Sequence, residues 1–213
     1  MIVSVTRNLR ISMLAMVGAV ALAAAAFEVP ASAAAPMNLV PTFQDPDQPP
    51  ALPPIKGEEQ LAKNLQRTPV FFRTQYPKGS IVIDTTERYL YFIDAPNHAL
   101  RYGIAVGKEG FQWDGLLKVS KKAQWPDWRP PPEMIAREKK KGRNLPSVVP
   151  GGPTNPLGAR AIYLGYTQYR IHGTTQPKSI GKAASSGCFR MLNEHVIDLY
   201  DRVKVGAWVV VRS

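Results

Sequence analysis

The chain has 213 residues, of which 27 are Lys or Arg and 16 are Asp or Glu, giving a net charge of +11. Its one cysteine, Cys188, has no second cysteine to pair with, so an internal disulfide is excluded. So positive a chain is attracted to anionic polymers, membrane surfaces or nucleic acid, and charge alone does not choose among them.

The N-terminus carries the three parts of a secretory signal peptide. Arg7 and Arg10 give a positive start, residues 11–26 are mostly apolar, and Ala31-Ser32-Ala33 offers small residues at a cleavage site. The apolar run is shorter than the roughly 20 residues that span a bilayer, so we expect no stable membrane span after cleavage. Residues 1–33 are thus predicted to be a signal peptide, and the mature protein to be exported to the periplasm or cell envelope, where nucleic acid is not an expected partner.

Proline dominates the next segment. Between residues 37 and 57, six prolines lie among polar and acidic residues, which favours extended and poorly packed backbone. We expect residues 34–67 to be a linker, although a pro-segment has the same composition. Residues 68–213 then form one domain, large enough for a single core and too small for two.

Strand patterns prevail in that domain. Residues 80–84 and 88–93 are β-branched and aromatic runs separated by three residues, which indicates a hairpin. Further strand-like runs follow at 100–106, 161–164, 169–172 and 208–212. The segment 111–130 is rich in Trp, Pro and Gly, which indicates a long loop whose Trp rings either cover a substrate or seal the edge of the core.

Helical patterns are few. Residues 133–141 follow three prolines, and residues 193–203 place an apolar stripe on one helical face, with Asn193 as the expected N-cap. The predicted fold class is therefore mostly β, with one or two helices covering the sheet.

A histidine and the lone cysteine are the candidate reactive pair. His172 ends a predicted strand and Gly173 follows it, while Cys188 comes sixteen residues later. A free thiol is mostly protonated at neutral pH, so a nucleophilic cysteine needs a nearby base, and an imidazole serves. No acidic residue lies between the two, which leaves a backbone carbonyl near Gly173 as the candidate group that orients the ring.

The residues around the thiol suit attack on a carbonyl. Gly187 has no side chain to crowd the incoming group, and the N–H groups of Gly187 and Cys188 are candidates to bind a developing oxyanion. Arg190, two residues on, is expected on the same side of an extended strand, where it would bind a substrate carboxylate. The plain alternatives are a buried apolar cysteine, a core histidine and a surface arginine; His98 and His195 are not expected to be catalytic.

Several motifs in order resemble one family. They are Pro150-Gly151-Gly152-Pro153, Asn155-Pro156-Leu157-Gly158, His172-Gly173-Thr174, Ser179-Ile180-Gly181 and Ser185-Ser186-Gly187-Cys188-Phe189-Arg190-Met191, with Asn193 after them. Together they resemble the L,D-transpeptidases, the YkuD-type catalytic domain with ErfK/YbiS-like members. The resemblance implies a β-rich, sandwich- or barrel-like core and acyl transfer on peptidoglycan stem peptides during cell wall biogenesis, with no metal and no organic cofactor.

By position, the resemblance assigns Cys188 as nucleophile, His172 as base and Gly173 as the orienting carbonyl. The acyl group would pass from a tetrapeptide stem to an amine of another stem, or of an outer-membrane or envelope protein. One departure is Ser186, which stands where the commonest family pattern has a second histidine. A cysteine peptidase acting as an L,D-carboxypeptidase on the same stems, and a wall-binding module without activity, are the alternatives.

Overall fold

The computed structural model describes residues 52–108 and 113–213. The predicted signal peptide and the first part of the predicted linker lie outside them, as does the start of the predicted 111–130 loop. In the described part of the chain, no helix is both long enough and apolar enough to cross a membrane.

Strands make up most of the regular structure, as the sequence predicts. The strands are β1 (Thr68–Phe71), β2 (Ile81–Asp84), β3 (Tyr89–Ala95), β4 (His98–Gly103), β5 (Val106–Gly107), β6 (Gly115–Gln124), β7 (Arg160–Leu164), β8 (Arg170–His172), β9 (Ala183–Ser185), β10 (Phe189–Arg190) and β11 (Trp208–Arg212). The α-helices are α1 (Pro132–Lys139) and α2 (Asn193–Arg202), and short 3-10 turns lie at Glu58–Gln60, Lys63–Leu65 and Pro177–Ser179.

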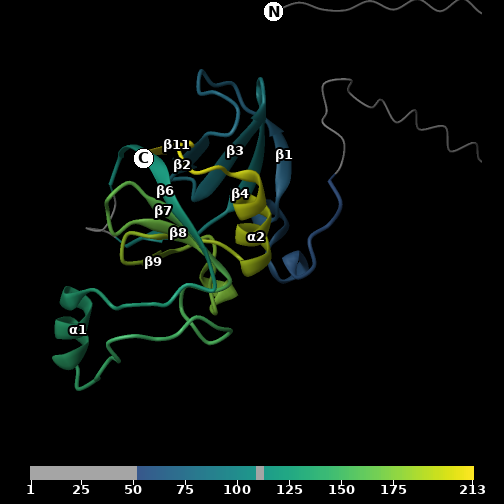
Figure 1. Ribbon diagram of the computed structural model, residues 1–213. Coiled ribbons are helices and arrows are strands. Elements are labelled where there is room, and N and C mark those ends of the chain that lie inside the picture. The colour runs from purple at the N-terminus through teal and green to yellow at the C-terminus, as the bar shows by residue number, and fades with distance from the viewer. Residues whose placement is uncertain (1–51, 109–112) are drawn as a thin grey trace, which may run out of the picture. The chain divides into compact units, whose positions relative to one another are not determined.

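One large mixed sheet organises the domain (Figure 1). Its strand order is β1-β4-β3-β2-β11-β6-β7-β8-β10. The main core cluster draws side chains from β2, β3 and β4 in one half of the sheet and from β7, β8 and β10 in the other. Both halves therefore enclose the same core, which accords with the predicted sandwich- or barrel-like class.

The predicted hairpin is confirmed. β2 and β3 pair antiparallel, with Ile81 opposite Phe92 and Ile83 opposite Leu90, and all four of these side chains are buried. Because β-branched and aromatic side chains pack well on a pleated surface, this pair forms the part of the core that the sequence pattern marks most clearly.

The prediction of a loop over 111–130 is wrong for its middle. Residues Gly115–Gln124 form β6, the longest strand in the described part of the chain, which pairs antiparallel with both β11 and β7 and so joins the two halves of the sheet. Only Val119 of this strand is fully buried, since most of its side chains face solvent. A strand with one buried side chain carries almost no hydrophobic alternation, so its pairing depends on its neighbours.

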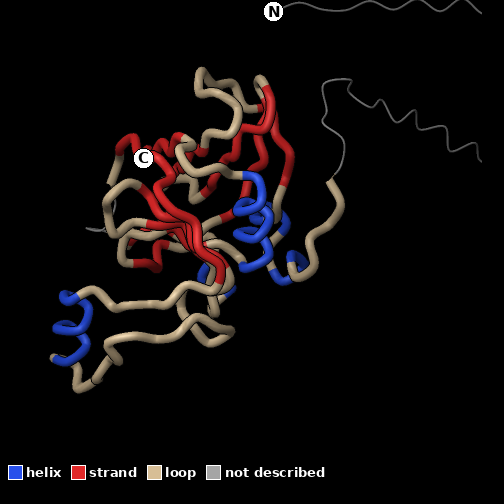
Figure 2. The backbone as a smooth tube through the Cα atoms, in the orientation of Figure 1, coloured by secondary structure: helices blue, strands red, loops and turns tan. Residues whose placement is uncertain are grey.

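The two helices differ in what they cover. α2 packs on β7 and β8, with Val196 and Leu199 buried, as the apolar stripe predicts. α1 has no fully buried residue and lies in a long excursion between β6 and β7 that leaves the sheet (Figure 2). Of the one or two helices that were predicted to cover the sheet, only α2 does so.

The predicted cap of α2 is corrected. The helix has Leu192 at its N-cap position with no capping side chain, and Asn193 is its first residue. The Asn193 side chain bonds instead to the backbone of residues 159 and 174, beside the turn that follows β8. Tertiary contacts thus take the polar group that local capping rules assign to the helix.

The end of the predicted linker packs on the domain. Glu58 and Leu61 are buried, and Leu61 joins a small cluster with Ile180 and Leu192. Glu58 Oε1 lies 2.7 Å from Nε2 of the buried His195 in α2. Residues 58–67 therefore continue the folded domain at its N-terminal side.

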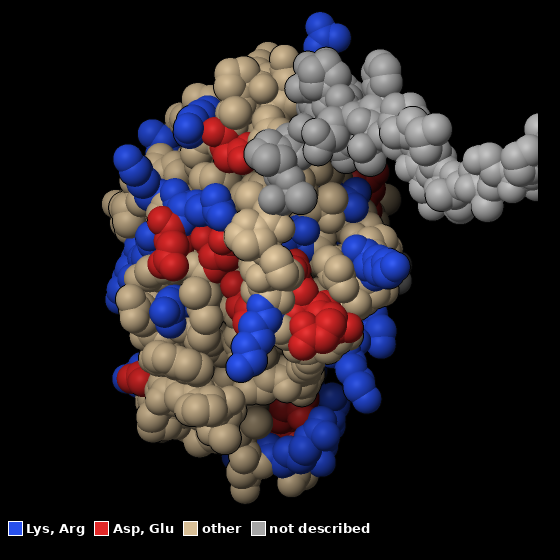
Figure 3. All heavy atoms as spheres, turned by 90° about the vertical axis from the view of Figure 1, so that its right-hand side faces the viewer, with Lys and Arg blue, Asp and Glu red and all other residues tan. Residues whose placement is uncertain are grey.

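Charge is spread over the face that carries β1 and α2. Figure 3 shows Lys and Arg side chains across this face with Asp and Glu side chains between them. The excess of positive charge is therefore not gathered in one patch there.

Candidate active site

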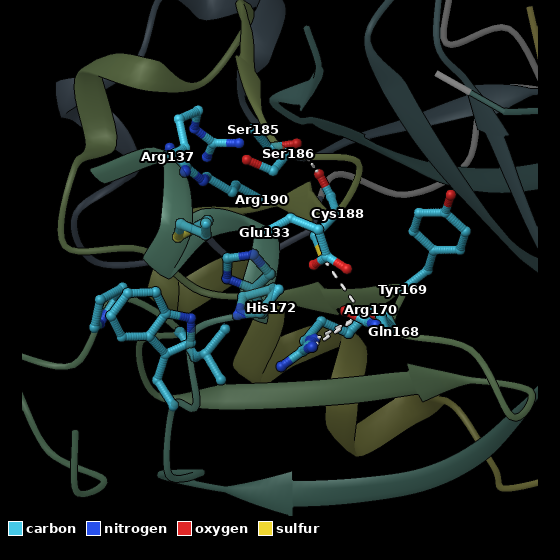
Figure 4. A pocket seen from close by; sticks show the side chains of 15 residues that line it. Glu133, Arg137, Gln168, Tyr169, Arg170, His172, Ser185, Ser186, Cys188 and Arg190 are labelled. Atoms are coloured by element: carbon cyan, nitrogen blue, oxygen red, sulfur yellow. Dashed lines mark hydrogen bonds between the residues drawn. The ribbon is translucent and has the colours of Figure 1, made fainter. Parts of the chain in front are cut away.

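His172 and Cys188 line the same pocket, of about 420 Å³ (Figure 4). Its walls come from the α1 excursion, the loop before β7, the turn from β7 to β8, and the segment from β9 to β10. The lining residues are Trp128, Pro131, Glu133, Met134, Arg137, Pro156, Leu157, Gln168, Tyr169, Arg170, His172, Ser185, Ser186, Cys188 and Arg190.

Parallel pairing of β8 with β10 brings the two motifs together. Arg190 lies opposite His172 and Phe189 opposite Ile171, and the Met191 N–H donates to the His172 carbonyl at 2.8 Å. Because these two short strands are held by buried Ile171 and Phe189, the fifteen residues between His172 and Cys188 form a loop that returns the cysteine to the side of the histidine. Strand register thus fixes which side chains share the site.

The His172 ring is buried, and the backbone carbonyls of Gly173 and Leu157 lie beside it. Nδ1 lies 2.6 Å from the Gly173 carbonyl oxygen, and since a carbonyl only accepts, Nδ1 carries the proton and Nε2 the free lone pair. Burial, with help from the positive charges of Arg190 and Arg170, lowers the pKa of His172 to about 3. The imidazole is therefore neutral, and able to accept a proton, throughout the neutral range.

Cys188 is partly exposed and rests as a thiol. Burial raises the pKa of Cys188, and the positive charges of Arg170 and Arg190 oppose that rise. Its Sγ lies 3.7 Å from the Gln168 carbonyl, and among the described residues it makes no hydrogen bond to His172. The resting pair is a neutral thiol and a neutral imidazole, and a proton transfer between them would require the thiol to turn from the Gln168 carbonyl.

Asn193 holds the turn after β8. Its Oδ1 accepts from the N–H groups of Ala159 at 3.0 Å and Thr174 at 3.2 Å, and its Nδ2 donates to the Thr174 carbonyl at 3.1 Å. Gly158 and Gly173 pack so closely around this amide that a Cβ on either would overlap Asn193 Oδ1. Asn193 therefore positions the Gly173 carbonyl, and through it the His172 ring.

A buried asparagine holds the loop that forms the wall beside His172. Asn155 Nδ2 donates to the carbonyls of Val149 and Pro150, both at 2.9 Å, and its Oδ1 accepts from the Leu157 N–H at 2.9 Å. Leu157 and Pro156 of this loop line the pocket. The motif that precedes the histidine in the sequence is thus a structural support of the site.

The loop before the thiol differs from the expected arrangement. Gly187 has φ 101°, a left-handed conformation that favours glycine, but its N–H donates to Ser185 Oγ at 3.2 Å. Ser185 Oγ in turn donates to the Cys188 carbonyl. The Cys188 N–H, by contrast, has no partner in residues 52–108 and 113–213, so it is the better candidate oxyanion donor.

Two adjacent serines should therefore respond differently to loss of their hydroxyls. The buried Ser185 hydroxyl accepts from the Gly187 N–H and donates to the Cys188 carbonyl. Ser186 is exposed at the pocket wall. We expect Ser185→Ala to slow acylation by about 10- to 100-fold, because a buried N–H loses its partner, at a cost of roughly 1–3 kcal/mol. Ser186→Ala should slow it less than about threefold, and comparable losses in both, measured as acylation rates, would contradict this division.

Several site residues were not predicted from the sequence. Glu133, Met134 and Arg137 reach the pocket from α1, and Arg170 from β8. The spacing of four residues between Glu133 and Arg137 predicts that both lie on one face of the helix. No sequence pattern predicts that this face lines the pocket of Cys188.

Two tryptophans of the segment 111–130 lie in different places. Trp113 stacks on Tyr169, with ring centroids 4.5 Å apart, and its Nε1 donates to the Gly187 carbonyl at 3.4 Å. Trp113 therefore covers the edge of the core beside residues 185–188. Trp128 lines the pocket.

The other two histidines lie elsewhere. His98 Nδ1 pairs with Asp94, and buried His195 contacts Glu58. Neither lines the pocket. In residues 52–108 and 113–213 no three His, Cys, Asp or Glu side chains gather as metal ligands would.

Comparison with known proteins identifies the family. Residues 78–211 match the L,D-transpeptidase catalytic domain family, YkuD. The chain is 38% identical over 134 residues to the probable L,D-transpeptidase YbiS of Escherichia coli K12, covering 61% of this chain and 43% of that protein. It is 35% identical over 135 residues to the probable L,D-transpeptidase ErfK/SrfK of the same strain, covering 62% and 43%.

Among solved structures, the fold is similar to that of an L,D-transpeptidase from Mycobacterium smegmatis. The TM-score is 0.51 at 18% identity, covering 64% of this chain and 59% of that one. The fold is a mostly β domain of the kind found in L,D-transpeptidases, with a histidine and a cysteine in one pocket. The match over residues 78–211 shows that the chain belongs to the L,D-transpeptidase catalytic domain (YkuD) family. The chain spans less than half the length of the two E. coli relatives.

Proposed function

We propose that the chain is an exported peptidoglycan L,D-transpeptidase with Cys188 as nucleophile. The observation that carries the proposal is the shared pocket, in which a neutral His172, held by Gly173, stands with the only cysteine of a chain in this family. His172 Nε2 takes the thiol proton as Sγ attacks the carbonyl of the L-centre of a tetrapeptide stem. The Cys188 N–H supports the oxyanion that forms.

In the remaining steps His172 passes the thiol proton to the leaving amine and later returns a proton to the sulfur. His172 gives its proton to the amine of the terminal D-amino acid, the C–N bond breaks, and a thioester remains on Cys188. An acceptor amine then attacks the thioester, the C–S bond breaks, and the proton released from that amine passes through His172 to the sulfur. Arg170 and Arg190, the cations that act on the thiol, are suited to hold carboxylates of the donor stem.

Transfer to water instead of an amine is the second candidate. The same thioester resolved by water makes the chain an L,D-carboxypeptidase-like cysteine peptidase. The site is open to solvent at the exposed Ser186 side, so both outcomes use the same residues. The acceptor amine comes from another stem or from an envelope protein, and the expected signal peptide at 1–33 would deliver the enzyme to that compartment.

Intact-protein mass spectrometry with tetrapeptide muropeptides tests the proposal. We expect a stem adduct on the mature chain, loss of one D-amino acid, and no adduct on Cys188→Ala, because no other thiol exists in the chain. With acceptor stems present, the adduct should resolve to crosslinked dimers. Resolution to hydrolysed stem alone would favour the peptidase, and the absence of any adduct on the intact chain would overturn both.

A further inference from the structure

Helix α1 brings two opposite charges to the pocket. Glu133 and Arg137 lie four residues apart, hence on one face of the helix, and both line the pocket that contains Cys188 (Figure 4). Within residues 52–108 and 113–213, Glu133 is the only acidic residue that lines the pocket, against the three cations Arg137, Arg170 and Arg190. Among the described walls of the pocket, α1 is therefore the one that presents both signs of charge.

These two charges do not neutralise each other. A Glu and an Arg at this spacing are placed to form an ion pair, yet none lies between them. The Glu133 carboxylate has no ion pair or hydrogen bond among the described residues. Arg137 has only a long contact, 3.8 Å, to Glu138, whose closer partners are Lys141 and Arg143. Both groups are thus free to bind a ligand.

A ligand that satisfies both groups carries an ammonium and a carboxylate side by side. Glu133 would accept hydrogen bonds from the ammonium, and the Arg137 guanidinium would bind the carboxylate. An α-amino acid centre with both groups free has this chemistry, whereas the side-chain amine of a lysine within a protein has no free carboxylate beside it.

We infer that Glu133 and Arg137 form the acceptor subsite and select an amine that belongs to a free amino-acid centre. This inference rests on the proposed function, because it concerns the amine that resolves the thioester. Arg170 and Arg190, whose charges act on Cys188 and His172, serve the part of the donor stem that stays on Cys188. The α1 wall serves the amine that attacks the thioester. Because this attack is the reverse of the step that releases the terminal D-amino acid, the same wall also holds that leaving group.

The protons balance in this arrangement. The bound ammonium first gives one proton to the Glu133 carboxylate, which passes it to water. The neutral amine then attacks the thioester carbonyl, the N–C bond forms and the C–S bond breaks. A second proton goes from the attacking nitrogen to His172 and on to the Cys188 sulfur, and the third stays on the new amide.

Partitioning of a preformed thioester tests the inference. The intact mature chain is first acylated with a tetrapeptide muropeptide, and the adduct is then resolved with deuterated D-alanine or with deuterated D-alaninamide, which has a neutral amide in place of the carboxylate. The label distinguishes the captured product from the donor, because capture by D-alanine rebuilds a tetrapeptide. We expect D-alanine to be preferred, and Arg137→Gln to reduce the ratio of the two capture rates about tenfold, because the variant loses the charge-assisted hydrogen bond to the carboxylate. Both enzymes meet the same two amines, so differences in amine basicity cancel from the comparison.

Two further variants complete the design. Glu133→Gln should slow capture by both amines relative to hydrolysis by about tenfold, since both carry the ammonium that this carboxylate binds. Lys139→Gln removes the same charge as Arg137→Gln from the same helix, but Lys139 does not line the pocket, so it should leave the ratio unchanged.

The proposed function and the acceptor subsite can be refuted by different results. Failure to form any adduct on Cys188 would contradict the proposed function. A normal adduct whose preference for D-alanine is absent, unchanged in Arg137→Gln, or lost equally in Lys139→Gln would overturn the acceptor subsite alone.

Discussion

Replacement of His172 by Gln should slow acylation of Cys188 by about 1,000-fold at pH 6, within the range of roughly 10²–10⁴ that a general base contributes. The reason is that burial raises the pKa of the Cys188 thiol, so little thiolate exists unless a neighbouring base takes the proton. Glutamine has no basic nitrogen to accept that proton. The measurement is the rate of adduct formation with a muropeptide donor, followed by mass spectrometry.

The pH dependence separates a base from a structural group. The pKa of His172 is lowered to about 3, so the imidazole stays neutral as pH falls through the ordinary histidine value of about 6.5, and the native rate should be flat between pH 5 and 8. In His172→Gln the thiolate must form without a base, so the rate should rise about tenfold per pH unit up to the thiol pKa. A uniform deficit at every pH would show that His172 acts only by shaping the pocket.

Gly158→Ala should destabilise the domain by about 3 kcal/mol or more, combining left-handed strain of roughly 1–2 kcal/mol with overpacking of roughly 1–3 kcal/mol. Gly158 has φ 64°, and an added Cβ would overlap Asn193 Oδ1 and lie 2.6 Å from the Thr174 nitrogen. The Asn193 amide must then move, and its hydrogen bonds to Ala159 and Thr174 are lost.

Gly79→Ala is the matched control. Gly79 also has a left-handed φ, 90°, but a Cβ there meets nothing within 4 Å. It should therefore cost only the backbone strain, about 1 kcal/mol. The measurement is chemical unfolding of both variants beside the native domain, together with their acylation rates. Equal losses of unfolding free energy in the two variants would contradict the role of close packing around Asn193. Only Gly158→Ala should also slow acylation, because Asn193 holds the turn that orients His172.

Local patterns were enough wherever an element buries one regular face. The hairpin of β2 and β3 follows from β-branched and aromatic runs around a three-residue turn, and α2 follows from an apolar stripe with a period near 3.6. The reactive pair was also visible, because a single cysteine and a histidine followed by glycine stand within motifs that resemble one family. The signals for the hairpin and the helix lie within a few neighbouring residues, whereas the signal for the site is the order of several short motifs between residues 150 and 193.

What the sequence by itself determined, then, is a mostly β domain of the L,D-transpeptidase type with Cys188 and His172 as its candidate pair. Only the tertiary structure decided that 115–124 is the strand joining both halves of the sheet, that Asn193 supports Gly173 instead of capping its helix, and that α1 faces the thiol. The physical reason is the same for all three. Pairing of an exposed strand, the choice of partner for an amide, and the placement of a helix on a long excursion depend on groups distant in the chain, which local periodicity does not record.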